Sequence, residues 1–163
     1  MKKILFLLVA FSVMGPAMGF ASDEDLYLNA FGEAATAYLS DSHLLLGATA
    51  DGFVADIIQK NTAEEIAKSV QKRVRIIRAK LKAVAESPIS EVDKKLIGLL
   101  DKAYACMDHQ AWALVQHVEE KSPDTARRFA EQRSACEKRI DQFAKFYSTL
   151  PPAPELPEPL STR

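Results

Sequence analysis

Two cysteines, Cys106 and Cys136, carry the clearest chemistry in this chain. They flank residues 120–123, whose sequence EKSP favours a turn between two helical stretches. Facing residues of an antiparallel helical hairpin have numbers that sum to a constant, so this pair places the turn at Lys121. Packed helices bring facing Cα atoms to roughly 5 to 6 Å, a separation that suits a disulfide. We therefore predict a disulfide that joins two long helices.

The other residue types capable of catalysis form no known active-site pattern. The histidines are His43, His109 and His117, and the chain has no Glu-x-x-His motif of the kind that di-iron bundles use. Haem ligation by Met107 would need His43 from another helix, because residues two apart point to different faces. No nucleophile elbow or phosphate-binding loop occurs. We therefore predict no enzymatic activity, no metal and no cofactor.

A weaker candidate for a ligand site lies beside the cysteines. The hairpin rule places His109 opposite Arg133, so a small ligand or anion could bind between them. The residues of this candidate site are Tyr104, Met107, His109, Trp112 and Arg133. The simpler alternative, which we favour, is that Arg133 extends toward solvent and pairs with Asp108.

Charge is divided unevenly along a nearly neutral chain. Residues 22–59 contain seven acidic residues and no Lys or Arg, whereas residues 60–85 carry a net charge of +6. Lys68, Arg75 and Lys82 recur every seven residues and form a candidate anion-binding stripe. We favour the alternative that an acidic first helix and a basic second helix lie side by side and complement each other. The overall balance argues against binding to nucleic acid.

The start of the chain has the pattern of a secretory signal peptide. Lys2 and Lys3 precede an apolar run from residue 4 to residue 14, and small residues surround a cleavage site after Ala21. This run is too short to span a bilayer. We expect residues 1–21 to be removed and the remainder to be periplasmic or secreted, without a transmembrane segment. An oxidising compartment is also where disulfides persist.

Helical periodicity predicts four helices in residues 22–150. The first runs from Ser22 to about Gln59, and we prefer one continuous helix to a break near Asp41. A capping box of Thr62 and Glu65 predicts the start of the second. The expected core stripe of the second helix is Ile66, Val70, Val74, Ile77, Leu81 and Val84.

Serine residues mark the starts of the last two helices. Ser90 and Ser122 are each suited to cap a helix, and Pro123 fits the first helical position. Short connections then predict an all-α, antiparallel up-down-up-down bundle of four long helices, in which Leu81 lies near Leu96. Residues 151–163 are rich in proline and are predicted to be a disordered tail.

These patterns support three hypotheses about function. The first is an exported, non-enzymatic bundle that binds another protein, as adaptors, chaperone-like proteins and sensors do. The second is a carrier of a small ligand or cofactor at the site near Met107, His109 and Arg133. The third is a protein whose basic second helix binds anionic envelope polymers or a lipid surface.

Overall fold

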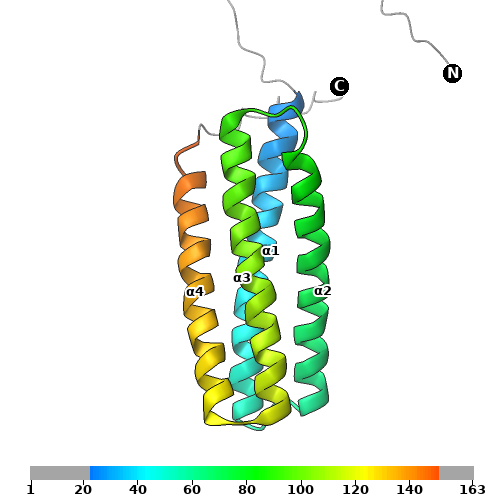
Figure 1. Cartoon of the computed structure of the whole chain (residues 1–163), viewed down its shortest axis with the longest axis vertical. Coiled ribbons are helices and arrows are strands. Elements are labelled where there is room, and N and C mark those ends of the chain that lie inside the picture. The colour runs from blue at the N-terminus through cyan, green and yellow to red at the C-terminus, as the bar shows by residue number, and fades with distance from the viewer. Residues whose placement is uncertain (1–22, 151–163) are drawn as a thin grey trace, which may run out of the picture.

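The computed structural model describes residues 23–150, with side chains from residue 32 onward. It contains α1 (Asp23–Val54), α2 (Lys60–Ala85), α3 (Glu91–Glu120) and α4 (Pro123–Tyr147), and this part of the chain has no strand. The helices form the predicted antiparallel bundle, in which α3 lies in front of α1 and between α2 and α4 (Figure 1). The predicted signal peptide and the predicted tail lie outside the described residues.

The first helix is continuous through Asp41, as preferred, but it ends at Val54 rather than near Gln59. Its end is closed by the Gly52 carbonyl, which accepts from the backbone N–H of Ile57 at 2.8 Å and of Ile58 at 3.0 Å. Asp56 has a φ of 56° there, a left-handed conformation that Asp tolerates better than most residues. These bonds satisfy a helix-end carbonyl and reverse the chain toward α2.

The predicted capping box of Thr62 and Glu65 is wrong. The N-cap of α2 is Gln59, whose side chain makes no capping bond, and the helix begins at Lys60. Ala63 is fully buried, so the first turn of α2 already packs against the core. Burial of this turn therefore decides where the helix begins, ahead of the local capping signal.

The buried side of α2 is also turned from the predicted stripe. Val70, Val74 and Leu81 are buried as expected. Ile66, Ile77 and Val84 are only partly buried. The remaining buried positions are Ala63 and Ala67, whose short side chains reduce the space needed between α2 and the rest of the bundle.

The predicted caps of the last two helices are confirmed. The Ser90 side chain accepts from the Asp93 backbone N–H at 3.1 Å. Ser122 and Thr125 form a reciprocal capping box at the start of α4, with proline at the first helical position. Between them, Lys121 ends α3 in a left-handed conformation with a φ of 47°. This turn lies where the cysteine spacing predicted it.

The hairpin register is confirmed by the disulfide itself. Cys106 and Cys136 are bonded, and their Cα atoms lie 5.3 Å apart. The register between α2 and α3 is close to the predicted one, because Arg78 Nε donates to Asp101 Oδ1 at 2.8 Å and Leu81 lines the same groove as Ile97. Sequence separation about each turn therefore predicts which residues face each other in both hairpins.

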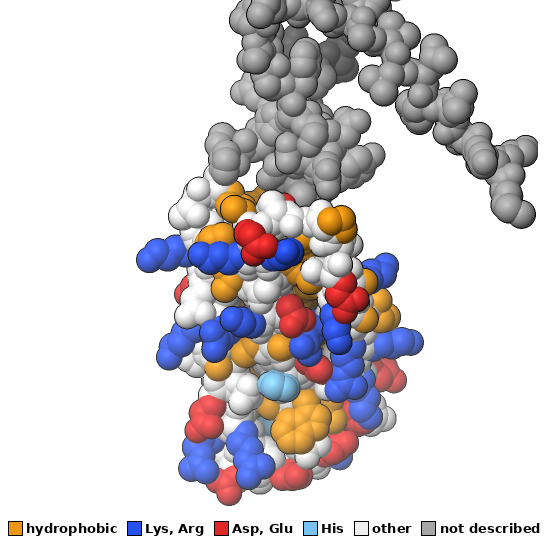
Figure 2. Space-filling view, turned by 45° about the horizontal axis from the view of Figure 1, so that its top comes forward, with side chains coloured by type: hydrophobic (Ala, Val, Ile, Leu, Met, Phe, Trp, Pro, Cys, Tyr) orange, Lys and Arg blue, Asp and Glu red, His pale blue; other side chains and the backbone are white. Residues whose placement is uncertain are grey.

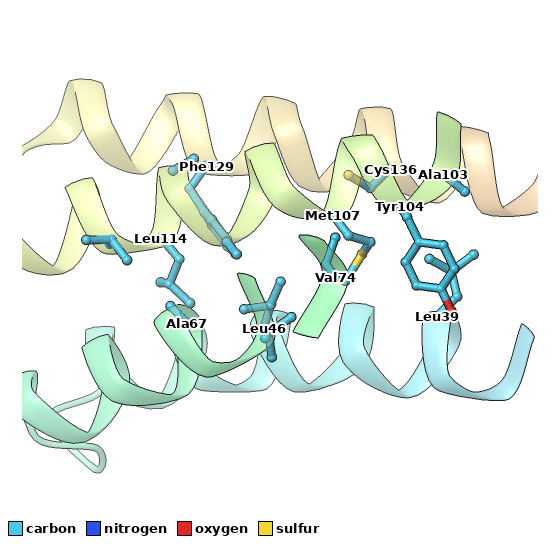
Figure 3. Close-up of a cluster of buried hydrophobic side chains, with 14 of the residues drawn as sticks. Leu39, Leu46, Ala67, Val74, Ala103, Tyr104, Met107, Leu114, Phe129 and Cys136 are labelled. Atoms are coloured by element: carbon cyan, nitrogen blue, oxygen red, sulfur yellow. The ribbon is translucent and has the colours of Figure 1, made fainter. Parts of the chain in front are cut away.

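The first two helices are neighbours, as predicted, but no ion pair joins them within the part of the chain whose side chains are described. The arginines of α2 that form ion pairs within the described part reach α3, where Arg75 binds Asp108 and Arg78 binds Asp101. Of the acidic residues of α1, Asp51 pairs with Arg133 of α4 instead, and Glu33 and Asp41 are exposed. Between the helices lies an apolar core to which all four contribute (Figure 3).

The disulfide should contribute a large share of the stability of this domain. Removing it by the paired change Cys106→Ala and Cys136→Ala should lower the free energy of unfolding by roughly 3 to 4 kcal/mol, the loop-entropy value for a loop of this length. Urea unfolding followed by circular dichroism measures the change, and reduced wild-type protein is the control. A difference below about 0.5 kcal/mol would contradict the assignment, because that is the scale of an ordinary surface change.

Candidate functional site

Two residues of the predicted ligand site, Tyr104 and Met107, are fully buried in the core (Figure 3). The Tyr104 hydroxyl donates to the backbone carbonyl of Ala35 on α1 at 2.8 Å. Burial raises the pKa of Tyr104 well above its usual range, so the phenol stays neutral. Tyr104 is therefore a polar link between α1 and α3 within the core.

The other three residues of that site lie outside the core. His109 and Trp112 are exposed on α3. Arg133 reaches α1 instead, where its Nη1 donates to Asp51 Oδ2 at 3.4 Å. A Cβ built on Gly47 would come within 2.7 Å of the Arg133 guanidinium, so glycine leaves the room in which that group lies. The structure does not bring His109 and Arg133 together.

The favoured alternative for Arg133 is corrected in its partner. Arg133 does extend toward the surface and forms an ion pair, but with Asp51 rather than with Asp108. Asp108 is held by Arg75, whose Nε donates to both carboxylate oxygens at 3.0 and 3.1 Å. The hairpin rule gives the level of a residue along the bundle, and it does not say to which neighbouring helix a long side chain turns.

The predicted anion-binding stripe is partly neutralised by acidic neighbours. Lys68 pairs with Glu64 one turn earlier on α2, and Arg75 pairs with Asp108. Lys82 lines a groove of about 360 Å³ between α2 and α3 together with Arg78 and Lys94. Of the three predicted residues, Lys82 is the one that forms no ion pair within the described part of the chain.

A buried amide on α3 was not predicted from the sequence. Gln110 has no exposed surface, and its Oε1 accepts from His43 Nδ1 on α1 at 2.9 Å. Its Nε2 has no hydrogen-bond partner within the described residues. This polar contact and the Tyr104 bond both tie α3 to α1.

A second buried polar group, His117, lies near the opposite end of the bundle from the α2–α3 turn. Its Nδ1 is 3.3 Å from Thr125 Oγ1, and its ring meets Phe53 edge-on at 5.8 Å between centroids. Burial, with a smaller contribution from the nearby Lys121 ammonium, lowers the pKa of His117. Neutral imidazole is therefore the form that this packing favours.

The spacing of α3 contained a signal for both buried polar residues. Gln110 and His117 continue the steps of three and four that connect Met107 with Leu114. A search for apolar residues at this spacing leaves both of them out because they are polar, although their positions on α3 are buried. Periodicity therefore locates the core better than residue type does here.

Large hydrophobic side chains are exposed along the second half of α1 and in the turn that follows it. Seven large hydrophobic side chains are exposed, and four of them lie between residues 44 and 57: Leu44 (64%), Leu45 (46%), Val54 (61%) and Ile57 (80%). An exposed group of this kind is typical of a contact surface rather than of a catalytic centre. A nearly continuous apolar helix offers more than one periodic stripe, so spacing alone does not say which of these apolar residues are buried.

The described residues contain neither a metal-binding cluster nor a membrane-spanning helix. Nowhere in this part of the chain do three or more His, Cys, Asp or Glu side chains gather closely enough to hold a metal ion. None of the four helices combines the length and the apolar character needed to cross a bilayer. Comparisons with known protein families, with curated proteins and with solved structures found no match.

Burial of His117 predicts that stability falls in mild acid. The unfolded chain takes up a proton near the usual histidine pKa, about 6.5, before the folded chain does. Stability should therefore be constant above that pH and decline as the pH falls through it. Urea midpoints from about pH 7.5 to about pH 5.5 test this, since His117→Asn should flatten the decline. An unchanged slope in that variant would contradict the role of His117.

The Tyr104 hydroxyl should contribute measurably to stability. Tyr104→Phe removes its bond to Ala35 and should lower the free energy of unfolding by about 1 kcal/mol. Tyr38→Phe is a matched control, because the buried Tyr38 hydroxyl has no partner among the described residues. Thermal and urea unfolding of both variants measure the difference, and equal losses would contradict the assignment.

Proposed function

We propose that this protein acts by binding another protein, and that it does so through the outward side of α1. The observation that carries this proposal is the exposure of Leu44, with Leu45 next to it, on the side of α1 that faces away from the core. Burying apolar surface of this kind is the main favourable contribution to most protein association. The proposed role is binding rather than catalysis, in an exported protein as the first residues of the chain predict.

The spacing of exposed residues on α1 suits a helical partner. Exposed positions recur in steps of three and four along this side of the helix, as Ala34, Ala37, Asp41, Leu44, Ala48 and Asp51. This is the spacing by which one helix packs along another in a coiled coil. The alanines would allow a partner helix to approach closely, and Leu44 would supply the central large contact. We name this set the α1 stripe.

The charge of α1 suggests the chemistry of that partner. Residues 23–59 contain no Lys or Arg, and the acidic residues Asp41 and Asp51 lie within the α1 stripe. Asp51 is paired with Arg133, whereas Asp41 has no ion pair within the described part. A partner helix with an apolar seam and basic residues beside it would complement both properties.

Charge also argues against a parallel pairing of two copies of this chain. Such a pairing would place Asp41 opposite Asp41 and Asp51 opposite Asp51, and like charges at a helix contact are destabilising. An antiparallel pair avoids this and is one outcome of the experiment below. The proposed occupant is a separate, basic amphipathic helix.

The experiment is photocrosslinking in cells of the source organism. A photoreactive residue at Leu44 or Ala48 should give an adduct whose partner segment is helical and basic. The controls are Ala79 on α2 and Ala135 on α4, which are exposed on other helices. Adducts at all four positions, or at none, would contradict the proposal, and an adduct with a second copy of the chain would replace the proposed partner.

Affinity for the partner identified in this way should depend on Leu44 and Leu45. Leu44→Ala with Leu45→Ala should weaken binding by about tenfold or more, because truncating a central apolar contact costs at least about 1 kcal/mol. Leu44 is 64% exposed and Leu45 is 46% exposed, so the loss of folding stability should be small compared with that from truncating a core leucine. Ile76→Ala is the matched control, because Ile76 is 50% exposed on α2. Calorimetric titration measures all three proteins, and equal affinities would overturn the role of α1.

A further inference from the structure

A second surface lies on the other side of the bundle, centred on α3. Helix α3 contacts α1 through Tyr104, α2 through Asp101 and α4 through Cys106, so its fourth side faces outward. Figure 2 shows this side, with Lys and Arg side chains around exposed hydrophobic groups and acidic side chains both among them and at the lower end. We define the basic face as Lys68, Lys72, Arg75, Ile76, Lys82, Lys94, Lys102 and Trp112.

The positive charge of the basic face is only partly compensated. Lys72, Lys82 and Lys102 are exposed and form no ion pair within residues 32–150. The two aspartates nearest to them are already engaged, because Asp101 is held by Arg78 and Asp108 by Arg75. An anion near this surface would therefore be attracted by lysines that have no ion-pair partner. It would be repelled less by Asp101 and Asp108, because an arginine already pairs with each of them.

Two shallow grooves give the basic face places for anionic groups. One, of about 360 Å³, is lined by the apolar residues Leu81, Ala85 and Ile97 and by Arg78, Lys82, Lys94 and Asp101. Arg78 pairs with Asp101 and Lys94 with Glu91, so Lys82 is the cation of this groove that has no ion pair among the described residues. Gly98 lies in the same groove, and a Cβ built there would meet no atom within 4 Å, so the groove is open on the α3 side. The groove thus combines apolar side chains with a cation, which suits a headgroup whose charge remains near solvent.

The second groove continues the first along α2. It measures about 410 Å³ and is lined by Lys68, Lys72 and Arg75 beside the exposed Ile76. Ala79 lines both grooves, so the two adjoin. Cations therefore follow α2 for about four turns, a length of roughly 20 Å at 1.5 Å per residue.

An exposed tryptophan lies at the level of this second groove. Gln71 and Arg75 both bond to Asp108, so Trp112, one turn further along α3, lies level with Lys68 on the antiparallel α2. Trp112 is 51% exposed and Ile76 is 50% exposed. Tryptophan favours the boundary between lipid headgroups and acyl chains, because its ring is apolar and its indole N–H is polar.

From this arrangement we propose that the basic face binds peripherally to the surface of an anionic phospholipid bilayer. The cations contact phosphate-bearing headgroups, and Trp112 and Ile76 enter the interface between them. Exposed apolar side chains among the cations favour a lipid surface over a soluble polyanion, which would leave those side chains in water. The basic face is separate from the α1 stripe. The proposal for the basic face does not depend on the function proposed for the α1 stripe.

The test uses protein released by an exporting host and vesicles of two compositions. One contains phosphatidylcholine alone, and the other contains equal parts of phosphatidylcholine and phosphatidylglycerol. Trp112 is the only tryptophan of the chain, so its emission reports this surface directly. We expect flotation with the anionic vesicles only, a blue shift of the emission on binding, and weaker binding as salt is raised.

A matched pair of charge variants locates the binding surface. Lys72→Glu, Lys82→Glu and Lys102→Glu together should weaken vesicle binding by at least about tenfold, because each juxtamembrane cation contributes about a factor of five. The control carries the same charge change on other surfaces, at Arg73, Lys80 and Lys138, which are all exposed. Both variants should keep the circular dichroism spectrum of the wild type.

Three results would overturn the proposal. The first is equal binding to both vesicle compositions, or binding to neither. The second is an equal loss of binding in the control variant, which would indicate attraction by net charge alone. The third is tight binding of soluble polyphosphate without flotation or a blue shift of Trp112, which would assign the basic face to a polyanion in solution.

Discussion

Burial of α3 on three sides is the constraint on which the rest of this structure depends. Thirteen residues of α3 are buried, compared with four of α4. A different kind of bond secures each side: the Tyr104 hydroxyl reaches α1, aspartates reach the arginines of α2, and a disulfide reaches α4. The other helices are therefore arranged around α3, and each keeps an outward side that the core does not use.

The two proposed surfaces follow from that arrangement. Because the arginines of α2 pair with α3, they do not neutralise the acidic residues of α1. Helix α1 is left with an apolar and acidic outward side, and the side centred on α3 collects lysines around Trp112. The bundle thus presents two surfaces of opposite charge, each combined with exposed apolar groups. The two proposals therefore use different sides of the same domain.

The core also contains polar contacts that an apolar bundle of this size would not need. His43 with Gln110, and His117 with Thr125, each join two helices through a buried or partly buried hydrogen bond. Such bonds add little net stability, but leaving either partner unpaired is costly. They therefore disfavour alternative registers in which the same helices slide or rotate relative to one another.

The local signals in the sequence were sufficient for the number and order of the helices, the two serine caps and the hairpin register. Ser90 and Ser122 cap the helices that their positions predicted, and the turn between Cys106 and Cys136 brings the cysteines together. These features depend on hydrogen bonds within a few residues or on simple counting about a turn, so the sequence alone determines them. Counting about the turn did not predict the candidate ligand site correctly. Its residues lie at similar heights along the bundle, but their side chains point toward different neighbouring helices or toward solvent.

Only the tertiary structure decided how each helix is rotated about its axis and which neighbour its long side chains reach. Ala63 and Ala67 rather than Ile66 face the core of α2, and Arg133 turns to Asp51 rather than to Asp108. The sequence also did not determine that Leu44 and Leu45 would be exposed on a largely apolar helix. The physical reason is that these choices depend on the packing of all four helices at once. A helix with several possible apolar stripes buries the one that fits its neighbours.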